Sequence, residues 1–165
     1  MIKTTTFSFS YKEYETTEDL ESDDRELIYA ARATALNAYA PYSRLKVGAA
    51  IRLNSGTIVC GTNVENAAFP SGICAERNAL STSVSNYSND KPVSLAIAAM
   101  TENGLTDDPV PPCGNCRQVI AEEELRTGRK IRIILSGKNR ILIVESISSL
   151  LPLQFNKKNL KVILP

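Results

Sequence analysis

The sequence predicts an α/β protein in which helices cover both faces of one β-sheet. Segments whose apolar residues recur at helical spacing alternate along the chain with short runs of strand character. Alternation of this kind favours a sheet with helices packed on both sides. The length of 165 residues suggests one domain with a sizeable core.

The first predicted helix follows an acidic start signal. Ser22-Asp23-Asp24 with Glu26 behind it is typical of a helix N-terminus. Apolar residues then recur at helical spacing, and we expect Pro41 to end this helix.

A hairpin, a second helix and a buried strand follow. Residues 47–53 and 57–62 flank Asn54-Ser55-Gly56, which predicts a β-hairpin. Residues 73–84 have helical character, and the run 93–100 is apolar enough for a strand buried on both faces. This order begins the alternation on which the fold prediction rests.

The rest of the chain continues the alternation. A loop rich in Asp and Pro, residues 107–112, precedes a predicted helix over 113–125. Residues 131–135 and 140–144 are typical of strands, and 146–151 predicts a short last helix. The prediction therefore contains five strands.

The first 21 residues differ from the rest in composition. They are rich in Thr, Ser and Glu, and Phe7, Phe9 and Tyr11 alternate with polar residues. We expect an N-terminal extension over 1–21 without fixed structure, ahead of a single catalytic domain over 22–165. The alternation leaves open a strand added at a sheet edge, or a contact between subunits.

Composition excludes several classes of function. The net charge of +1 gives no basic excess of the kind that duplex nucleic acid requires. No apolar run approaches the roughly 20 residues needed to span a membrane. The N-terminus lacks the apolar region of a signal peptide, so we expect a cytoplasmic protein with reduced thiols.

Three of the four cysteines lie in two short motifs, and the chain contains no histidine. The motifs are Cys74-Ala75-Glu76-Arg77 and Pro112-Cys113-Gly114-Asn115-Cys116-Arg117. Three thiolates fill three positions of a tetrahedral zinc site and leave the fourth open. An open position is where zinc activates water as a nucleophile, and Glu76 could move the protons.

Other uses of these cysteines stay open. Four cysteines could form two disulfides, although a core of this size does not need them. A structural zinc site would need a fourth ligand, for which Cys60 is the spare cysteine; we interpret Cys60 as a buried strand residue without chemistry. A redox pair of the thioredoxin type would follow the first strand, which this order does not match.

Zinc with three thiolates carries a formal charge of −1, which weakens its pull on water. Both motifs are predicted to open helices, whose N-termini carry about half a positive charge and lower thiol pKa values. Arg77 is well placed to donate hydrogen bonds to cysteine sulfur and so tune the metal; the less favoured alternative is a solvated surface residue. Glu76 by itself could be an ordinary first-turn carboxylate, but its neighbourhood favours a catalytic role.

The sequence resembles the cytidine deaminases of the small, three-cysteine, homotetrameric type. The resemblance covers most of residues 25–160. Besides the two cysteine motifs it rests on Ala40-Pro41-Tyr42-Ser43, Val47-Gly48-Ala49-Ala50, Gly61-Thr62-Asn63-Val64-Glu65-Asn66-Ala67, Gln118-Val119, and Leu150-Leu151-Pro152 with Phe155. It implies a three-layer α/β/α sandwich with a mixed sheet of about five strands.

The resemblance also implies the activity and the cofactor. It implies hydrolytic deamination of cytidine and deoxycytidine to uridine and deoxyuridine with release of ammonia, a step of pyrimidine salvage. One Zn²⁺ per subunit would be held by Cys74, Cys113 and Cys116, with Glu76 as the proton shuttle. The expected partners are a nucleoside substrate and further copies of the chain in a homotetramer, with neither nucleic acid nor membrane.

Five further residues are implied to contact the substrate. Asn63 and Glu65 would hydrogen-bond the ribose hydroxyls, which agrees with side chains at i and i+2 pointing the same way from an extended segment. The backbone of Ala75 would hold the pyrimidine, Leu45 would line the pocket, and Phe155 would reach a neighbouring subunit's base.

The chain departs from the family pattern at three positions. Leu45 stands where Phe is usual, Phe69 where Tyr is common, and Pro111 where Ser precedes Pro-Cys. These changes bear on pocket shape and substrate preference rather than on reaction type.

The rival functions are a deaminase for another aminopyrimidine such as blasticidin S, a deoxycytidylate deaminase, a polynucleotide-editing deaminase, and a zinc-stabilised interaction module. The deoxycytidylate and polynucleotide deaminases resemble a histidine-containing ligand set, which this chain lacks.

Overall fold

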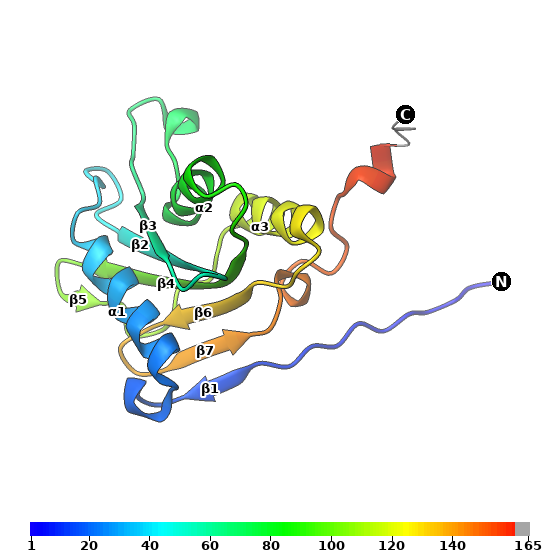
Figure 1. Cartoon of the computed structure of the whole chain (residues 1–165), viewed down its shortest axis with the longest axis horizontal. Helices are drawn as coiled ribbons and strands as arrows, with labels where there is room; N and C mark the ends of the chain where they lie inside the picture. The colour runs from blue at the N-terminus through cyan, green and yellow to red at the C-terminus, as the bar shows by residue number, and fades with distance from the viewer. Residues whose placement is uncertain (161–165) are drawn as a thin grey trace.

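The computed structural model describes residues 1–160, which contain one mixed β-sheet with helices on both faces (Figure 1). The sheet has the strand order β1-β7-β6-β4-β2-β3, and β5 pairs with β4 outside this path. The strands are Lys12–Tyr14 (β1), Lys46–Leu53 (β2), Ile58–Thr62 (β3), Pro92–Thr101 (β4), Gly104–Leu105 (β5), Arg132–Ser136 (β6) and Ile141–Val144 (β7). The helices are Ser22–Ala35 (α1), Ala75–Asn86 (α2) and Gly114–Thr127 (α3).

The direction of the strands follows from the connections. The pair β4 and β6 is parallel, because α3 carries the chain back along the sheet between them. The other paired strands run antiparallel. The β2–β3 pair is the hairpin predicted from Asn54-Ser55-Gly56, and Gly56 adopts a positive φ of 94° in its turn.

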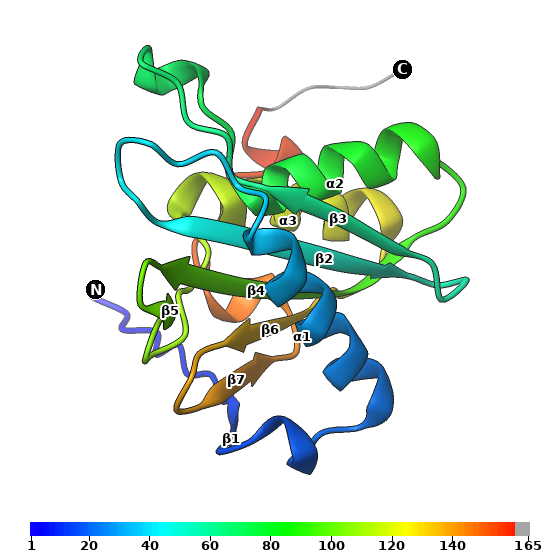
Figure 2. The same cartoon turned by 90° about the vertical axis from the view of Figure 1, so that its left-hand side faces the viewer.

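The central strand β4 faces two separate cores. Leu95 and Ile97 point into a cluster that includes residues of α2 and α3, whereas Ala96 and Ala98 point into a cluster with α1. Successive side chains of a strand point to opposite faces, so one apolar run supplies both cores. Figure 2 shows the resulting layers, with α1 on one side of the sheet and α2 and α3 on the other.

Helix α1 lies unusually close to β2. A Cβ added to Gly48 would lie 2.1 Å from the carbonyl oxygen of Ala31 and 2.5 Å from the backbone nitrogen of Ala35. The contact is therefore made by backbone atoms, and only glycine leaves room for it.

The predicted α/β fold with a mixed sheet is confirmed, but the strand number is higher than the five expected. The two additional strands are β1 and β5, which are three and two residues long. Runs this short carry no periodic signal by which a sequence pattern could find them.

The expected end of the first helix at Pro41 is wrong. Helix α1 ends at Ala35 because the chain turns through Leu36 and Asn37, whose N–H groups donate to Ala33 and Thr34. Tyr39 then forms a bridge with Val64, which draws this segment to the sheet.

The N-terminal extension contributes to the sheet at one edge. Residues 12–14 pair with β7, which is the edge-strand alternative left open by the sequence. Residues 1–11 continue away from the body of the molecule (Figure 1). The division into an extension over 1–21 and a domain over 22–165 stays a prediction, and its last five residues lie outside the described part.

Within residues 1–160, no helix combines the length and the apolar character needed to cross a bilayer.

We predict that Gly48→Ala destabilises the fold by about 2–3 kcal/mol, since the backbone of α1 must shift to admit the methyl group. Gly114→Ala is the matched control, because an added Cβ there meets nothing within 4 Å. Thermal unfolding of both zinc-loaded variants measures the difference. Equal midpoints would contradict the close approach of α1 to β2.

Candidate metal centre and active site

Two helix N-termini bring the three motif cysteines together. Cys74 is the N-cap residue of α2, and Cys113 is the N-cap residue of α3. Cys116 lies in the first turn of α3 and is buried. The prediction that both motifs open helices is therefore confirmed, and it places the thiols where the helix dipoles are positive.

The distances between the sulfur atoms suit one zinc ion. Sγ of Cys113 lies 3.9 Å from that of Cys74 and 3.4 Å from that of Cys116, and the three atoms lie within 4.8 Å of one another. With Zn–S distances near 2.3 Å, a tetrahedral ion places its sulfur ligands about 3.8 Å apart. All three cysteines are free thiols, so the cluster fits a Cys₃ metal site.

The environment of the thiols explains why a cation belongs there. Burial raises the pKa of the Cys74 and Cys116 thiols. Burial would also raise the pKa of Cys113, but hydrogen bonds, first from the backbone N–H of Cys116, outweigh it and hold that pKa below its ordinary value. Three thiolates so close together repel one another, and a divalent cation removes this penalty.

Cys60 is not buried as the sequence suggested. Cys60 belongs to β3, the edge strand of the sheet, where it pairs with Ala50 of β2. Its side chain is exposed. It is not one of the three cysteines that form the cluster, so no four-cysteine structural site forms among the described residues.

Glu76 lies in the first turn of α2, beside the thiols. Its side chain is only 5% exposed. Burial raises the pKa of its carboxyl group, partly offset by a hydrogen bond from its own backbone N–H. A carboxyl whose pKa is raised toward neutrality can both accept and return a proton, as a general base and acid must.

Cys74, Cys113 and Glu76 border a cavity of about 580 Å³, a size typical of small-molecule sites, and Cys116 is buried behind its wall. Its walls come from the loop before β2, the segment after β3, the start of α2 and the loop before α3. The lining residues are Tyr42, Ser43, Val47, Asn63, Val64, Glu65, Asn66, Phe69, Gly72, Ile73, Cys74, Ala75, Glu76, Ile97, Val110, Pro111 and Cys113.

The side chain of Asn63 forms two hydrogen bonds with the backbone at the start of β2. Its Oδ1 accepts from the N–H of Val47 at 2.7 Å, and its Nδ2 donates to the carbonyl of Leu45 at 2.9 Å. An amide has two lone pairs on oxygen and two N–H donors, so one acceptor position and one donor remain.

Glu65 holds the loop before β2 with one carboxylate oxygen. Its Oε2 accepts from the backbone N–H groups of Tyr42 at 2.8 Å and Ser43 at 3.3 Å. A hydrogen bond from the Ser43 side chain, followed by these backbone bonds, lowers the pKa of Glu65, which keeps it ionised. Among residues 1–160 no bond to Oε1 is present, so that oxygen is available in the cavity.

The other predicted substrate residues divide into two groups. Ala75 lines the cavity, as do the two departures Phe69 and Pro111. Leu45 does not line it, and Val47 stands there instead. Phe155 lies outside the cavity, over a second hollow between α2, α3 and the turn Lys157–Leu160, with its carbonyl accepting from Gln118 at 2.8 Å.

Arg117 hydrogen-bonds the metal loop. Its Nε donates to the carbonyl of Pro112 at 2.8 Å, and its Nη1 donates to that of Leu150 at 2.9 Å. Within the described residues the guanidinium of Arg77 makes no hydrogen bond, so its part in tuning the metal stays a prediction. Arg117 directly follows Cys116 in the second cysteine motif, and this position is the sequence feature that could have indicated its role.

Tyr42 and Ile97 line the cavity but were not predicted as site residues, whereas Phe69 was named as a departure that bears on pocket shape. Tyr42 and Phe69 form an edge-on aromatic pair, 5.8 Å between ring centroids, at the cavity. Ile97 reaches it from the central strand. Tyr42 lies in a motif that was noted, but Ile97 gave no signal because a buried apolar strand residue is ordinary core.

Comparison with known proteins gives a consistent picture. Residues 21–129 match the family described as cytidine and deoxycytidylate deaminase zinc-binding region. The chain is 44% identical over 100 residues to a cytidine deaminase of Halalkalibacterium halodurans, covering 61% of this chain and 71% of that protein. It is 37% identical over 138 residues to one of Sporosarcina psychrophila, covering 84% and 95%.

Solved structures agree with the sequence matches. A cytidine deaminase from Burkholderia pseudomallei superposes with a TM-score of 0.67 at 35% identity, covering 79% of this chain and 97% of that one. One from Mycobacterium tuberculosis gives a TM-score of 0.65 at 31% identity, covering 82% and 99%.

We predict that Cys116→Ala lowers zinc affinity by at least about a hundredfold, since it removes a ligand rather than a residue that orients one. Cys60→Ala is the matched control and should retain the metal of the unaltered chain. Elemental analysis after dialysis against a chelator measures both. Full zinc in the Cys116 variant would contradict the ligand set.

Proposed function

Because the chain belongs to the cytidine and deoxycytidylate deaminase family, we propose that it hydrolyses cytidine and deoxycytidine to uridine and deoxyuridine with release of ammonia. The observation that carries the proposal is the cluster of three thiols beside a buried Glu76, with Cys74, Cys113 and Glu76 in the wall of one cavity of nucleoside size. Loss of cytidine absorbance on incubation with the zinc-loaded protein tests it directly.

The zinc would be held by Cys74, Cys113 and Cys116. When bound, zinc lowers the pKa of a water molecule so that it can attack C4 of cytosine. The helix N-termini of α2 and α3 offset part of the negative charge of the thiolates, and burial of Cys116 keeps bulk water from competing for the ligands.

We assign the proton transfers to Glu76. Its carboxylate takes the first proton from the attacking water and delivers it to N3 of the ring. It then takes the second proton and gives it to the amino nitrogen, so that the C4–N bond breaks and ammonia leaves. One water is consumed, C4 gains its carbonyl oxygen, and N3 keeps its proton in the uracil product.

The groups that remain free on two side chains suit the ribose. Asn63 retains one donor and one acceptor, and Glu65 retains the oxygen Oε1. Sugar hydroxyls both donate and accept, so this pair can bind them while the same side chains keep the loop before β2 in place. Ala75 lies between Cys74 and Glu76 in the cavity wall, where its backbone can meet the pyrimidine edge.

The charge of the cavity favours a nucleoside over a nucleotide. Among the described residues that line it, Glu65 and Glu76 are acidic and none is Lys or Arg. A phosphate group binds where cationic side chains or helix N-termini face it, and both helix starts here serve the thiols. Deoxycytidylate is therefore a weaker candidate than cytidine or deoxycytidine.

Phe155 has a role in this proposal only if subunits associate. It lies over the hollow beside α2 and α3 rather than over its own cavity, so it would serve the site of a neighbour in a homotetramer. Light scattering of the full chain tests the assembly. A location in the cytoplasm, where free nucleosides and reduced thiols occur together, completes the proposal.

We predict that Glu76→Gln leaves zinc bound and lowers kcat by about 10²–10⁴-fold, because an amide cannot carry the proton. Cytidine absorbance gives the rate, and elemental analysis of the same sample gives the metal. Turnover at the rate of the unaltered chain would contradict the role of Glu76.

We predict that Glu65→Gln raises KM for cytidine about tenfold or more and changes kcat less, since it weakens sugar binding and loop anchoring but leaves the thiols untouched. Glu102→Gln, exposed in the turn between β4 and β5, is the matched control and should leave both constants unchanged. An unaltered KM in the Glu65 variant would remove it from the binding site.

A further inference from the structure

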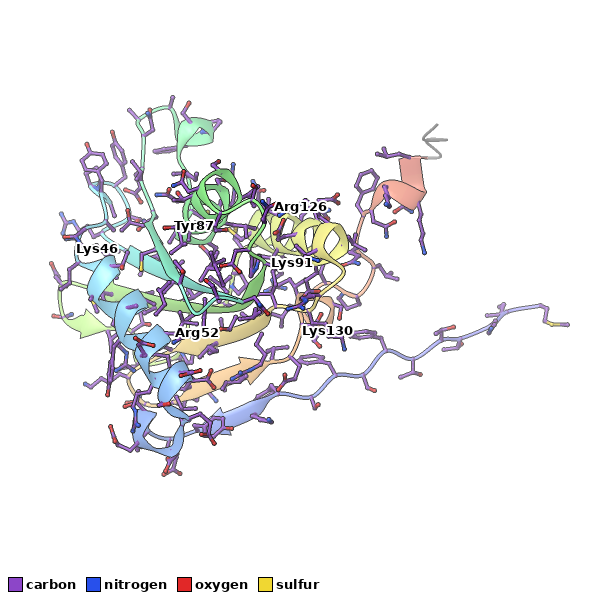
Figure 3. The ribbon with its side chains drawn as sticks, viewed as in Figure 1. Lys46, Arg52, Tyr87, Lys91, Arg126 and Lys130 are labelled. Atoms are coloured by element: carbon purple, nitrogen blue, oxygen red, sulfur yellow. The ribbon has the colours of Figure 1, made fainter. Side chains whose placement is uncertain are left out.

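The chain begins with an extended segment that nothing in the described structure covers. We call residues 1–11 the N-terminal arm. The arm continues the line of β1 beyond the end of β7 and leaves the body of the molecule (Figure 1). Its side chains project into the open on either side (Figure 3), and every residue of the arm is exposed.

The arm has the pattern of a strand with one aromatic face. Phe7, Phe9 and Tyr11 are each 52% exposed, and the rings of Phe9 and Tyr11 lie side by side, 6.4 Å apart. That spacing is expected for side chains two residues apart on one face of a strand. Thr4, Thr5, Thr6, Ser8 and Ser10 surround the aromatic residues, and the arm contains neither Gly nor Pro.

The edge of β1 that points away from β7 is free, because β1 is the last strand of the sheet. A long unpaired edge with apolar side chains is a template for another strand, and proteins normally cover it. Since β7 occupies one edge over Lys12–Tyr14, a partner strand can run along both the arm and β1 only on the other edge.

We propose that the arm pairs antiparallel with the arm of a second copy of this chain, around a two-fold axis at Phe9. In this register Phe9 faces the partner's Phe9, and Phe7 faces the partner's Tyr11. Three aromatic pairs then lie on one face, whereas centring on Ser8 or Ser10 gives only two. Opposed aromatic residues are favourable cross-strand pairs.

The same register also matches charges. It places Lys3 opposite the partner's Glu15 and sets no like charges opposite each other, because Lys12 faces the partner's Thr6 and Glu13 faces the partner's Thr5. A self-complementary patch of this kind is what a two-fold interface requires. The pairing joins the sheets of two chains through their β1 edges.

A disulfide cross-link tests the register. Residues opposite each other at the axis have Cα atoms about 4.5–5.5 Å apart, which suits a disulfide. In a zinc-loaded chain carrying Cys60→Ser, Phe9→Cys should form a covalent dimer under mild oxidation. Thr4→Cys is the matched control, equally exposed, because its two copies would lie about 34 Å apart. No dimer with Phe9→Cys, or equal dimer from both variants, would overturn the proposal.

A second set of variants tests whether the aromatic residues hold the pair together. In the zinc-loaded chain carrying Cys60→Ser and Phe9→Cys, replacing Phe7 and Tyr11 by Ser should lower the yield of covalent dimer about tenfold, because two cross-strand aromatic pairs are lost. Replacing Thr5 and Thr6 by Ser should keep that yield. Deaminase turnover should be the same in both variants, since the arm lies outside the cavity. An unchanged yield of dimer in the aromatic variant would contradict the proposal.

Discussion

The site depends on the placement of two helix N-termini side by side on one face of the sheet. Cys74 and Cys113 are 39 residues apart in the chain, yet their sulfur atoms lie 3.9 Å apart. What joins them is the core between α2, α3 and the sheet, to which Ala79, Ile120 and Ile97 belong. The packing of that core therefore sets the distance between the two cysteine motifs.

The electrostatics of the site follow from the same placement. Helix dipoles supply positive potential at the thiols. Histidine and cationic side chains do not contribute, because the chain contains no histidine and no Lys or Arg is among the described residues that line the cavity. The thiols can carry their charge only against a cation, and Glu76 is buried beside them with a raised pKa. A site of this kind handles protons and a neutral substrate, which is the chemistry that hydrolytic deamination of a nucleoside needs.

Hydrogen bonds tie the rim of the cavity to the frame of the protein. Asn63 and Glu65 hold the segment from Tyr42 to Val47 through its backbone, so the two side chains proposed for the ribose also build the wall that faces it. Arg117 connects the metal loop to the carbonyl of Leu150. Gln118 then connects α3 to Phe155, so the C-terminal segment and the metal centre share one helix.

The sequence alone determined the chemistry, because cysteine spacing, helix-start signals and the absence of histidine are local properties. It also determined the central strands and helices, whose apolar periodicity is long enough to be detected. Only the tertiary structure decided that helix α1 ends at Ala35, that Cys60 is exposed at an edge, and that Arg117 hydrogen-bonds the metal loop. It also decided that β1 and β5 pair at all, since strands of three and two residues form only where a neighbouring strand already offers its edge.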